Sequence, residues 1–332
     1  MNPIIAISMG DYNGIGPEVA LKTLEKLNLN KSTPIWIGIP EVFEMTMQQI
    51  GIQLNYRIMS DTDDIKDDII NIYPVPMEST FNVNYGAITA DAGKAAMIAV
   101  EKGIDFCLTK KCHALVTSPI SKEAISKAGY SVPGHTEFLA EKTNSKSIMM
   151  ILTGKKMRVG LSTIHIPVKN ISENIHVEKL NQQIQILHDS LVNDFGIKKP
   201  RIALLGLNPH AGDGGVLGDE EINHIIPSIQ KAKKNSLLVD GPFSADGYFA
   251  SDTYKQYDAT LAMYHDQGLI PFKTISFGYG VNFTAGLPII RTSPDHGTAF
   301  AIAGLNHADS QSFNEAYRLA LKMAKQRFSN DS

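Results

Sequence analysis

Residues 259–268, ATLAMYHDQG, show most directly how this chain is built. A short, mainly apolar run over residues 259–263 stops abruptly at polar residues, the first of which are Tyr264 and His265. Such a run is typical of a buried strand, and the polar residues indicate a loop that leaves its carboxyl end. Ligands of α/β proteins bind at the carboxyl ends of parallel strands. The stretch therefore predicts an α/β sheet with His265 at its ligand-binding edge.

Two other segments have the same pattern. MRVGLSTIH ends at His165, and PRIALLGLNPH ends at His210. Imidazole is a common ligand of divalent first-row metals, and a catalytic metal site uses three protein ligands and keeps a position open. No local H-x-x-x-H motif supports the three histidines, and each alone is more typical of a solvated residue. Their shared position leaves two interpretations open, a metal site made of His165, His210 and His265 or three unrelated polar histidines.

Length and charge exclude several classes of protein. The 332 residues exceed the roughly 250–300 at which single cores stop growing, so we expect two domains. Apolar residues make up 43% and charged residues 20%, an ordinary globular balance. The net charge of −3 lacks the basic excess of a protein that binds nucleic acid or a membrane surface. No apolar run approaches the ~20 residues of a membrane span.

The cysteines and the N-terminus indicate a cytoplasmic protein. Cys107 and Cys112 are the only cysteines, and their C-x4-C spacing lacks the second pair of a zinc site. We expect both to be reduced thiols, as is usual in the cytosol. The N-terminal MNPIIAISMGD has neither the basic segment nor the long apolar segment of a signal peptide.

Strand-like and helical patterns alternate along the whole chain. Apolar runs of strand length, such as residues 34–40 and 114–117, alternate with helical periodicity over residues 88–102, 177–195 and 314–328. This order predicts an α/β protein with a mainly parallel sheet. No linker of low complexity separates two lobes, so the chain is expected to cross between them more than once.

The first loop is rich in glycine. Residues 10–18, GDYNGIGPE, follow an apolar run and lead into a helix, for which Pro17 suits the first position and Glu18 complements the dipole. The loop matches neither G-x-G-x-x-G nor a phosphate-binding P-loop. A tight turn and a cradle for a cofactor both stay open, and the cofactor-binding residues are left unassigned.

Polar residues elsewhere complete a candidate site. Thr136 could cap the helix that begins near it, and His135 could donate to an anion held at that helix start or simply lie on the surface. Asp246 and Asp266 could orient the imidazoles of the metal site. The binding of a phosphorylated or carboxylated substrate is suited by Lys273, Asn282 and Arg291. For each of these residues, a role in a surface ion pair is the alternative. An acid–base role also stays open for Lys273, provided that it is buried.

Long stretches of the chain resemble one family. They run almost from end to end: GDYNGIGPE, VTSPISK, PGHTEFLA, LNPHAGDGG with GDEE, GPFSAD, YHDQGLIPFK, GVNFTAGLP and IRTSPDHGTAF. Together they resemble the 4-hydroxythreonine-4-phosphate dehydrogenases, NAD-dependent enzymes of pyridoxal phosphate biosynthesis. The resemblance implies a three-layer α/β/α fold of two lobes, like that of isocitrate and isopropylmalate dehydrogenases, with the active site in the cleft between the lobes.

The resemblance also implies roles for the candidate residues. His165, His210 and His265 match the ligands of a divalent metal (zinc, magnesium or cobalt), which in this family come from both subunits of a homodimer. The substrate contacts are matched by His135, Thr136, Lys273, Asn282 and Arg291. We divide the chain into a first lobe, residues 1–130 plus 285–332, and a second lobe, residues 131–284, with the three histidines and the dimer contacts.

The implied reaction is the oxidation of 4-phosphooxy-L-threonine with NAD or NADP. The metal acts as a Lewis acid on the substrate hydroxyl, and Lys273 or water accepts the proton. The product, 2-amino-3-oxo-4-phosphooxybutanoate, loses carbon dioxide to give 3-amino-2-oxopropyl phosphate. The rival functions are a dehydrogenase of 4-phospho-threonate or 4-phospho-erythronate, a metal-dependent aldolase or hydrolase, and a binding protein without activity.

Two positions depart from the family pattern. Tyr12 and Asn13 stand where the family more often has Pro-Ala, a change expected to alter the stiffness of the first loop. Ala301 stands where an aspartate is usual. The missing charge puts details of cofactor or substrate binding in question, but not the metal site.

Overall fold

The computed structural model describes residues 2–60, 64–77, 81–132 and 134–328, so that Pro133 of the motif PGHTEFLA lies outside the described residues. The chain divides into two units, one formed by Met1–Lys146 with Leu287–Ser332 and the other by Ser147–Gly286. Both termini belong to the first unit. Each unit is described by itself.

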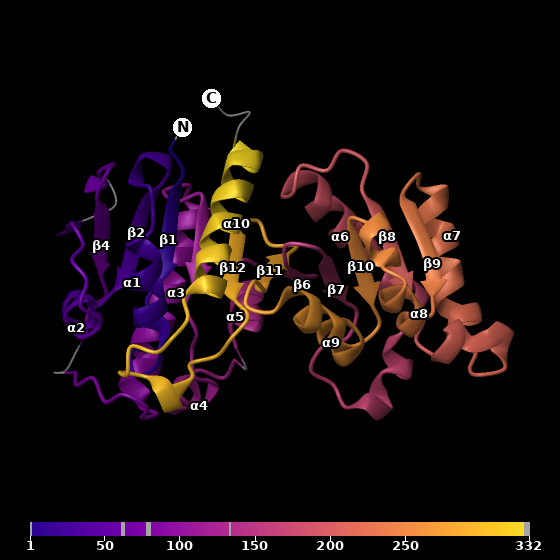
Figure 1. Ribbon diagram of the computed structural model, residues 1–332, viewed down its shortest axis with the longest axis horizontal. Helices are drawn as coiled ribbons and strands as arrows, with labels where there is room; N and C mark the ends of the chain where they lie inside the picture. Colours follow the sequence, from indigo (N-terminus) through magenta and orange to yellow (C-terminus); the bar gives the residue numbers. More distant parts are fainter. Residues whose placement is uncertain (1, 61–63, 78–80, 133, 329–332) are drawn as a thin grey trace. The chain divides into compact units, whose positions relative to one another are not determined.

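The first unit contains a fully parallel sheet in the order β3-β4-β2-β1-β5-β12 (Figure 1). Its strands are β1 (Ile4–Ser8), β2 (Thr33–Gly38), β3 (Tyr56–Ile58), β4 (Ile70–Pro74), β5 (Ala114–Thr117) and β12 (Ile290–Pro294). Strands β1 and β2 are buried almost throughout, which explains their continuous apolar sequence. In β12, Arg291 lies opposite Leu115 of β5, and this register brings two distant parts of the sequence together.

Helices cover both faces of this sheet. They are α1 (Gly16–Leu24), α2 (Pro40–Ile50), α3 (Ala90–Leu108), α4 (Lys122–Lys127), α5 (His135–Lys142) and α10 (Gln311–Phe328). Helix α3 packs on β1, β2 and β5 from one face, and α10 packs on β12, β5 and β1 from the other (Figure 1). The backbone of α3 lies very close to α4, since a Cβ at Gly93 would lie 2.3 Å from the carbonyl oxygen of Ala124. A side chain at Gly93 would therefore push the two helices apart.

The second unit has the strand order β11-β6-β7-β10-β8-β9. The strands are β6 (Met149–Thr153), β7 (Arg158–Leu161), β8 (Arg201–Leu205), β9 (Leu238–Phe243), β10 (Ala259–Ala262) and β11 (Val281–Ala285). Strands β7, β10, β8 and β9 are parallel, whereas β6 runs antiparallel to both of its neighbours. The mainly parallel sheet is thus confirmed, with β6 as the exception.

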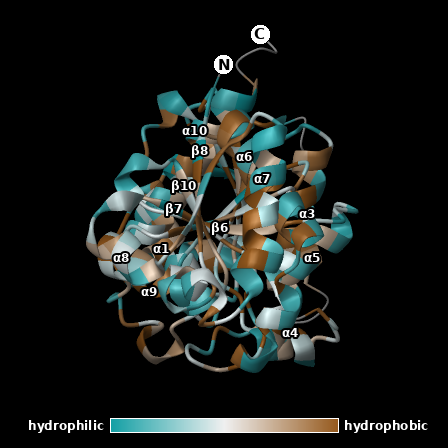
Figure 2. Cartoon of the chain, turned by 90° about the vertical axis from the view of Figure 1, so that its right-hand side faces the viewer, coloured by the Kyte–Doolittle hydropathy of each residue, from teal (hydrophilic) through white to brown (hydrophobic). Residues whose placement is uncertain are grey.

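The helices of the second unit are α6 (Val177–Asn193), α7 (Ile226–Lys234), α8 (Ala245–Ala250) and α9 (His265–Ser276). In α6 the buried apolar residues Leu180, Ile184, Leu187 and Leu191 recur every three or four positions. That spacing places them on one face of the helix. Figure 2 shows the result, with hydrophobic and hydrophilic residues alternating along α6 and α7. Helices α6 and α7 pack together, and α9 packs on β7 and β10, so the predicted α/β/α fold class is confirmed.

The first boundary between the units differs from the predicted one. The sequence placed it after residue 130, but the structure places it after Lys146. Helix α5 packs on α3 and therefore belongs to the first unit, together with His135 and Thr136. Among the described helices, none is long and apolar enough to cross a membrane.

Candidate metal and anion sites

Two of the three strand-end histidines lie side by side. Strand β10 lies between β7 and β8 in the sheet, so the segments after these strands leave the same edge. The rings of His165 and His265 have their centroids 6.1 Å apart, with an interplanar angle of 41°. Adjacent parallel strands thus bring together two imidazoles that are distant in the sequence.

His265 begins a helix rather than lying in a loop, which corrects the sequence interpretation. Tyr264 is the extended N-cap residue of α9, and His265 is the first helical residue. The side-chain oxygen of Gln267 accepts a hydrogen bond from the backbone N–H of Met263 at 2.7 Å. This bond ties the first turn of α9 to the residue before its N-cap. The helix start therefore fixes the backbone of His265.

His210 does not join this pair. It lies in the turn Pro209–Gly215 that follows β8, with its side chain exposed. Across the part of the chain that the structure describes, no three or more histidine, cysteine, aspartate or glutamate side chains are grouped closely enough to hold a metal ion. One chain therefore brings together two of the three predicted ligands, and not the third.

The two aspartates predicted to orient the imidazoles have different surroundings. Asp266 Oδ1 lies 2.7 Å from His265 Nδ1, a hydrogen bond that directs the other ring nitrogen, Nε2, away from the aspartate. Asp246 is exposed and accepts a hydrogen bond from Ser244 Oγ at 2.5 Å. This bond and the backbone N–H of Gly247 lower the pKa of Asp246, with a smaller contribution from His210.

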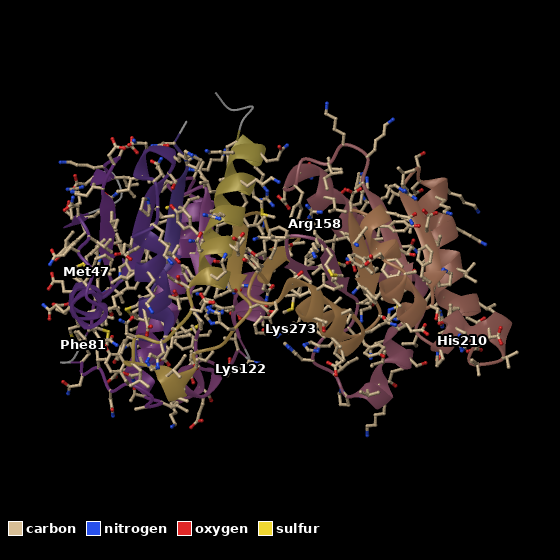
Figure 3. All side chains as sticks on the ribbon, in the orientation of Figure 1. Met47, Phe81, Lys122, Arg158, His210 and Lys273 are labelled. Atoms are coloured by element: carbon tan, nitrogen blue, oxygen red, sulfur yellow. The ribbon has the colours of Figure 1, made fainter. Side chains whose placement is uncertain are left out.

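Two predicted substrate contacts lie in the second unit. Lys273 lies on α9, and Figure 3 shows it at a different part of the unit from His210. The sequence left an acid–base role open for Lys273 only if its side chain were buried. The side chain is exposed, so that condition is not met. Asn282 lies on β11, and its Oδ1 is buried without a hydrogen-bond partner among the described residues.

Arg291 forms the centre of a second site, in the first unit. Its side chain is 2% exposed, and it donates hydrogen bonds from Nε (3.0 Å) and Nη2 (2.7 Å) to Thr117 Oγ1. Burial lowers the pKa of Arg291 to about 9. A buried guanidinium is stabilised by an anion that replaces its lost hydration, which makes the surroundings of Arg291 a candidate anion site.

His135 adds a neutral imidazole to the surroundings of Arg291. Burial, and secondarily the charge of Arg291, lower the pKa of His135 well below its usual value. Its Nε2 is buried without a hydrogen-bond partner in the described part of the chain. The N-cap of α5 is Gly134, so Thr136 lies within the first turn and is not the cap that the sequence suggested. The structure thus brings together His135 and Arg291, two of the predicted substrate contacts.

The glycine-rich loop is a tight turn packed against its neighbours. Gly10 has a φ of +74°, and a Cβ there would lie 2.6 Å from the carbonyl oxygen of Pro119. A Cβ at Gly14 would lie 2.8 Å from the carbonyl oxygen of Thr298. Within this loop Asp11 is fully buried and accepts a hydrogen bond from the backbone N–H of Asn13 at 3.0 Å. Burial raises the pKa of Asp11 to about 6.

The raised pKa of Asp11 predicts a specific pH dependence of stability. The folded protein holds the proton more tightly than the unfolded chain, so ionisation destabilises the fold as the pH rises from about 4 to about 6. Wild type should lose about 3 kcal/mol relative to Asp11→Asn between about pH 3 and about pH 7. Urea unfolding of both proteins at several pH values measures this difference. A stability difference that stays constant with pH would contradict the assignment.

The structure gives a role to the first departure from the family pattern. Asn13 Nδ2 donates to Thr89 Oγ1 at 3.1 Å, and Asn13 Oδ1 accepts from the backbone N–H of Asn84 at 2.8 Å. Tyr12 is buried beside Phe81, with ring centroids 5.8 Å apart. Both residues therefore tie the first loop to the segment before α3. Ala301 is exposed in a short 3-10 helix, Phe300–Ile302.

Comparisons with known proteins agree with these features. The sequence pattern of the family described as "Pyridoxal phosphate biosynthetic protein PdxA" matches residues 30–320. A 4-hydroxythreonine-4-phosphate dehydrogenase from Prosthecochloris aestuarii is 42% identical, over 98% of this chain and 99% of its own. A relative from Oceanobacillus iheyensis, provisionally named D-threonate 4-phosphate dehydrogenase, is 38% identical over 97% of this chain and 98% of its own.

Solved structures give the same result. The crystal structure of 4-hydroxythreonine-4-phosphate dehydrogenase from Klebsiella pneumoniae superposes with a TM-score of 0.89 at 35% identity, and the match covers 98% of each chain. The resemblance seen in the sequence motifs is confirmed. The chain belongs to the family of the pyridoxal phosphate biosynthetic protein PdxA.

Proposed function

We propose that this PdxA-family dehydrogenase oxidises 4-phosphooxy-L-threonine with NAD or NADP, as a step of pyridoxal phosphate biosynthesis. The product, 2-amino-3-oxo-4-phosphooxybutanoate, has its carboxylate β to the new ketone and therefore loses carbon dioxide to give 3-amino-2-oxopropyl phosphate. The observation that carries the proposal is the pair His165 and His265, whose rings have centroids 6.1 Å apart at the ends of adjacent strands. This pair offers two imidazole ligands, and His265 begins the helix, α9, that also carries the exposed Lys273.

The residues fit a divalent metal only in part within one chain. His165 and His265 can supply two ligands, and a catalytic site needs a third protein ligand. We assign the third position to His210 of a second copy. Imidazole ligands favour zinc or cobalt over magnesium, which prefers oxygen ligands. When bound, the cation would polarise the substrate hydroxyl as a Lewis acid.

A homodimer follows from this assignment, and exposed apolar residues support it. Val216, Leu217 and Ile222 are 77%, 44% and 47% exposed, and all three follow the turn that carries His210, Ile222 in the helical segment Glu221–Ile225. A second copy that receives this turn would cover them. In a two-fold symmetric dimer the same contact occurs twice, so both metal sites are completed together.

We assign the anionic groups of the substrate to the candidate residues of each unit. In the first unit Arg291 has the planar fork that suits a phosphate or carboxylate, and His135 Nε2 can donate or accept at the same place. Thr136 lies in the first turn of α5, where backbone N–H groups also favour an anion. In the second unit Lys273 and Asn282 are proposed as further substrate contacts. Because Lys273 is exposed, we assign the acceptance of the hydroxyl proton to a water molecule next to it. NAD or NADP, when bound, would supply the hydride acceptor.

A second candidate function is the oxidation of 4-phospho-threonate or 4-phospho-erythronate. The relative from Oceanobacillus iheyensis, at 38% identity, favours this alternative by its name. These compounds lack the amino group of 4-phosphooxy-L-threonine but keep its phosphate and hydroxyl groups. Steady-state kinetics with all three compounds would separate the two functions, because the true substrate should have the highest kcat/KM.

We also propose that the enzyme works in the cytoplasm. Cys107 and Cys112 are both free thiols and both buried, as suits a reducing compartment.

Production of NADH tests the proposed function directly. We expect NADH to form when 4-phosphooxy-L-threonine and NAD are added, and to stop forming after a chelator removes the metal. Zinc or cobalt added back to the chelated protein should restore the rate. Undiminished NADH formation in the metal-free protein would contradict the metal assignment. Turnover without NADH, as in an aldolase or hydrolase, or binding without any turnover, would contradict the proposed function itself.

A further inference from the structure

The turn that carries His210 has an unusual backbone. Five consecutive residues have left-handed conformations, and three of these are not glycine: His210 (φ 52°), Ala211 (φ 52°) and Asp213 (φ 43°). Each left-handed residue with a side chain costs about 1–2 kcal/mol, because its Cβ crowds the backbone. Contacts from outside the turn must offset this cost for the conformation to persist.

The side chain of Glu221 provides such contacts. It lies at the start of the helical segment Glu221–Ile225 and is 1% exposed. Its Oε1 accepts hydrogen bonds from the backbone N–H groups of Leu207 (2.7 Å) and Asn208 (2.8 Å). Its Oε2 accepts a third from Asn208 Nδ2 at 2.9 Å. One buried carboxylate thus holds the two residues that lead into the turn.

The same carboxylate also touches the middle of the turn. A Cβ at Gly212 would lie 2.6 Å from Glu221 Oε2, and one at Gly206 would lie 3.1 Å from Oε1. Both glycines therefore leave room for the carboxylate. An acid that only complements the helix dipole would lie in solvent, as Asp219 does, whereas Glu221 is buried.

Gln267 connects the segment that leads to His210 with the segment that leads to His265. Its Nε2 donates to the carbonyl oxygen of Gly206 at 2.6 Å, while its Oε1 accepts from the backbone N–H of Met263 at 2.7 Å. Met263 precedes α9, which begins with His265. The backbone that leads to His210 is thus held by Glu221 and by the helix of His265.

We propose that Glu221 is a positioning residue that holds His210 in the geometry needed to bind the metal. The proposal rests on the proposed function, in which His210 is a metal ligand. Glutamine cannot replace Glu221 fully, because an NH2 group takes the place of one carboxylate oxygen. That NH2 group is a donor and would face another donor, Asn208 Nδ2. Loss of a hydrogen bond that orients a metal ligand without touching the metal typically weakens metal binding by about 10–100-fold.

Cobalt binding to the full-length protein provides the test. Wild type, Glu221→Gln, His210→Ala and Asp219→Asn are titrated with Co²⁺, and the visible spectrum of the bound ion is recorded. We expect Glu221→Gln to bind Co²⁺ about 10–100-fold more weakly. At saturating Co²⁺ its kcat should fall by a smaller factor than its affinity. Asp219→Asn is the matched control, because it removes a nearby acid that bonds to Asn223 and not to the turn. Its affinity should equal that of wild type.

The two hypotheses fail in different ways. If wild type and His210→Ala bind Co²⁺ equally, the proposed metal site is wrong. If His210→Ala weakens binding but Glu221→Gln matches wild type, only the positioning role is wrong. Should Glu221→Gln not fold, Asn208→Ser removes the hydrogen bonds of Asn208 Nδ2 to Glu221 Oε2 and to Glu220 Oε2, and leaves the backbone N–H bonds to Glu221 Oε1. An unchanged Co²⁺ affinity in Asn208→Ser would then overturn the positioning role, and a weakened affinity with an altered spectrum would support it.

Discussion

His210→Ala should abolish turnover and leave the fold intact. His210 is exposed in a turn held by Glu221, and its ring fills no part of the core, so its loss leaves the packing unchanged. Without it, each metal would keep only the His165 and His265 rings of one chain. Lewis-acid stabilisation contributes several kcal/mol to the transition state, so we expect kcat/KM to fall by about 10³-fold or more.

The measurement combines NADH formation with bound metal and thermal unfolding. His188→Ala is the matched control, because it removes a histidine of the same unit that contacts Asp189 on helix α6 and lies outside the proposed site. The control should keep its metal and its activity. Full activity in His210→Ala, or full activity of any variant without metal, would contradict the role of this histidine.

Arg291→Lys should lower kcat/KM by about 10²–10³-fold, mainly through KM. The guanidinium is buried and donates through two nitrogens to Thr117 Oγ1, which leaves its planar fork fixed in one orientation. Lysine keeps the charge but not the fork, so the anion of the substrate loses paired hydrogen bonds. Loss of one partner of a buried charged contact costs about 2–5 kcal/mol, which corresponds to about 30- to 5,000-fold, and the expected fall lies within this range.

The control for Arg291 comes from the same unit. Arg318→Lys changes an exposed arginine that pairs with Glu315 at 3.5 Å on α10. Surface pairs of this kind contribute about 0–1 kcal/mol, so its kinetics should match wild type. An unchanged KM for the phosphorylated substrate in a folded Arg291→Lys protein would show that Arg291 does not bind the anion. Thermal unfolding separates this outcome from a loss of folded protein.

The sequence was sufficient to predict the sheet and the edge at which His165 and His265 lie side by side. Buried parallel strands need continuous apolar runs, so the ends of β7, β8 and β10 could be located from where those runs stop. The helix start at His265 was missed because no capping residue marks it: the N-cap, Tyr264, makes no side-chain cap hydrogen bond.

Other features depend on contacts between distant residues. Arg291 and Thr117 are 174 positions apart, and only the register of β12 on β5 makes them partners. The left-handed turn of His210 contains Ala211 and Asp213, residues that rarely adopt such a backbone, and the buried Glu221 bonds to the two residues that lead into it. The unit boundary after Lys146, rather than near residue 130, reflects contacts of α5 with α3 that no local pattern encodes.

Mixed dimers test most directly whether each metal site takes His165 and His265 from one chain and His210 from its partner. His165→Ala and His210→Ala, each inactive alone, are co-expressed with different tags, and the mixed dimer is purified. One of its two sites then has all three histidines, so it should recover about half of the wild-type activity per dimer. A mixed dimer of His165→Ala and His265→Ala should stay inactive, because these two rings come from the same chain. If His165→Ala with His210→Ala also stays inactive although the dimer forms, the shared site does not exist.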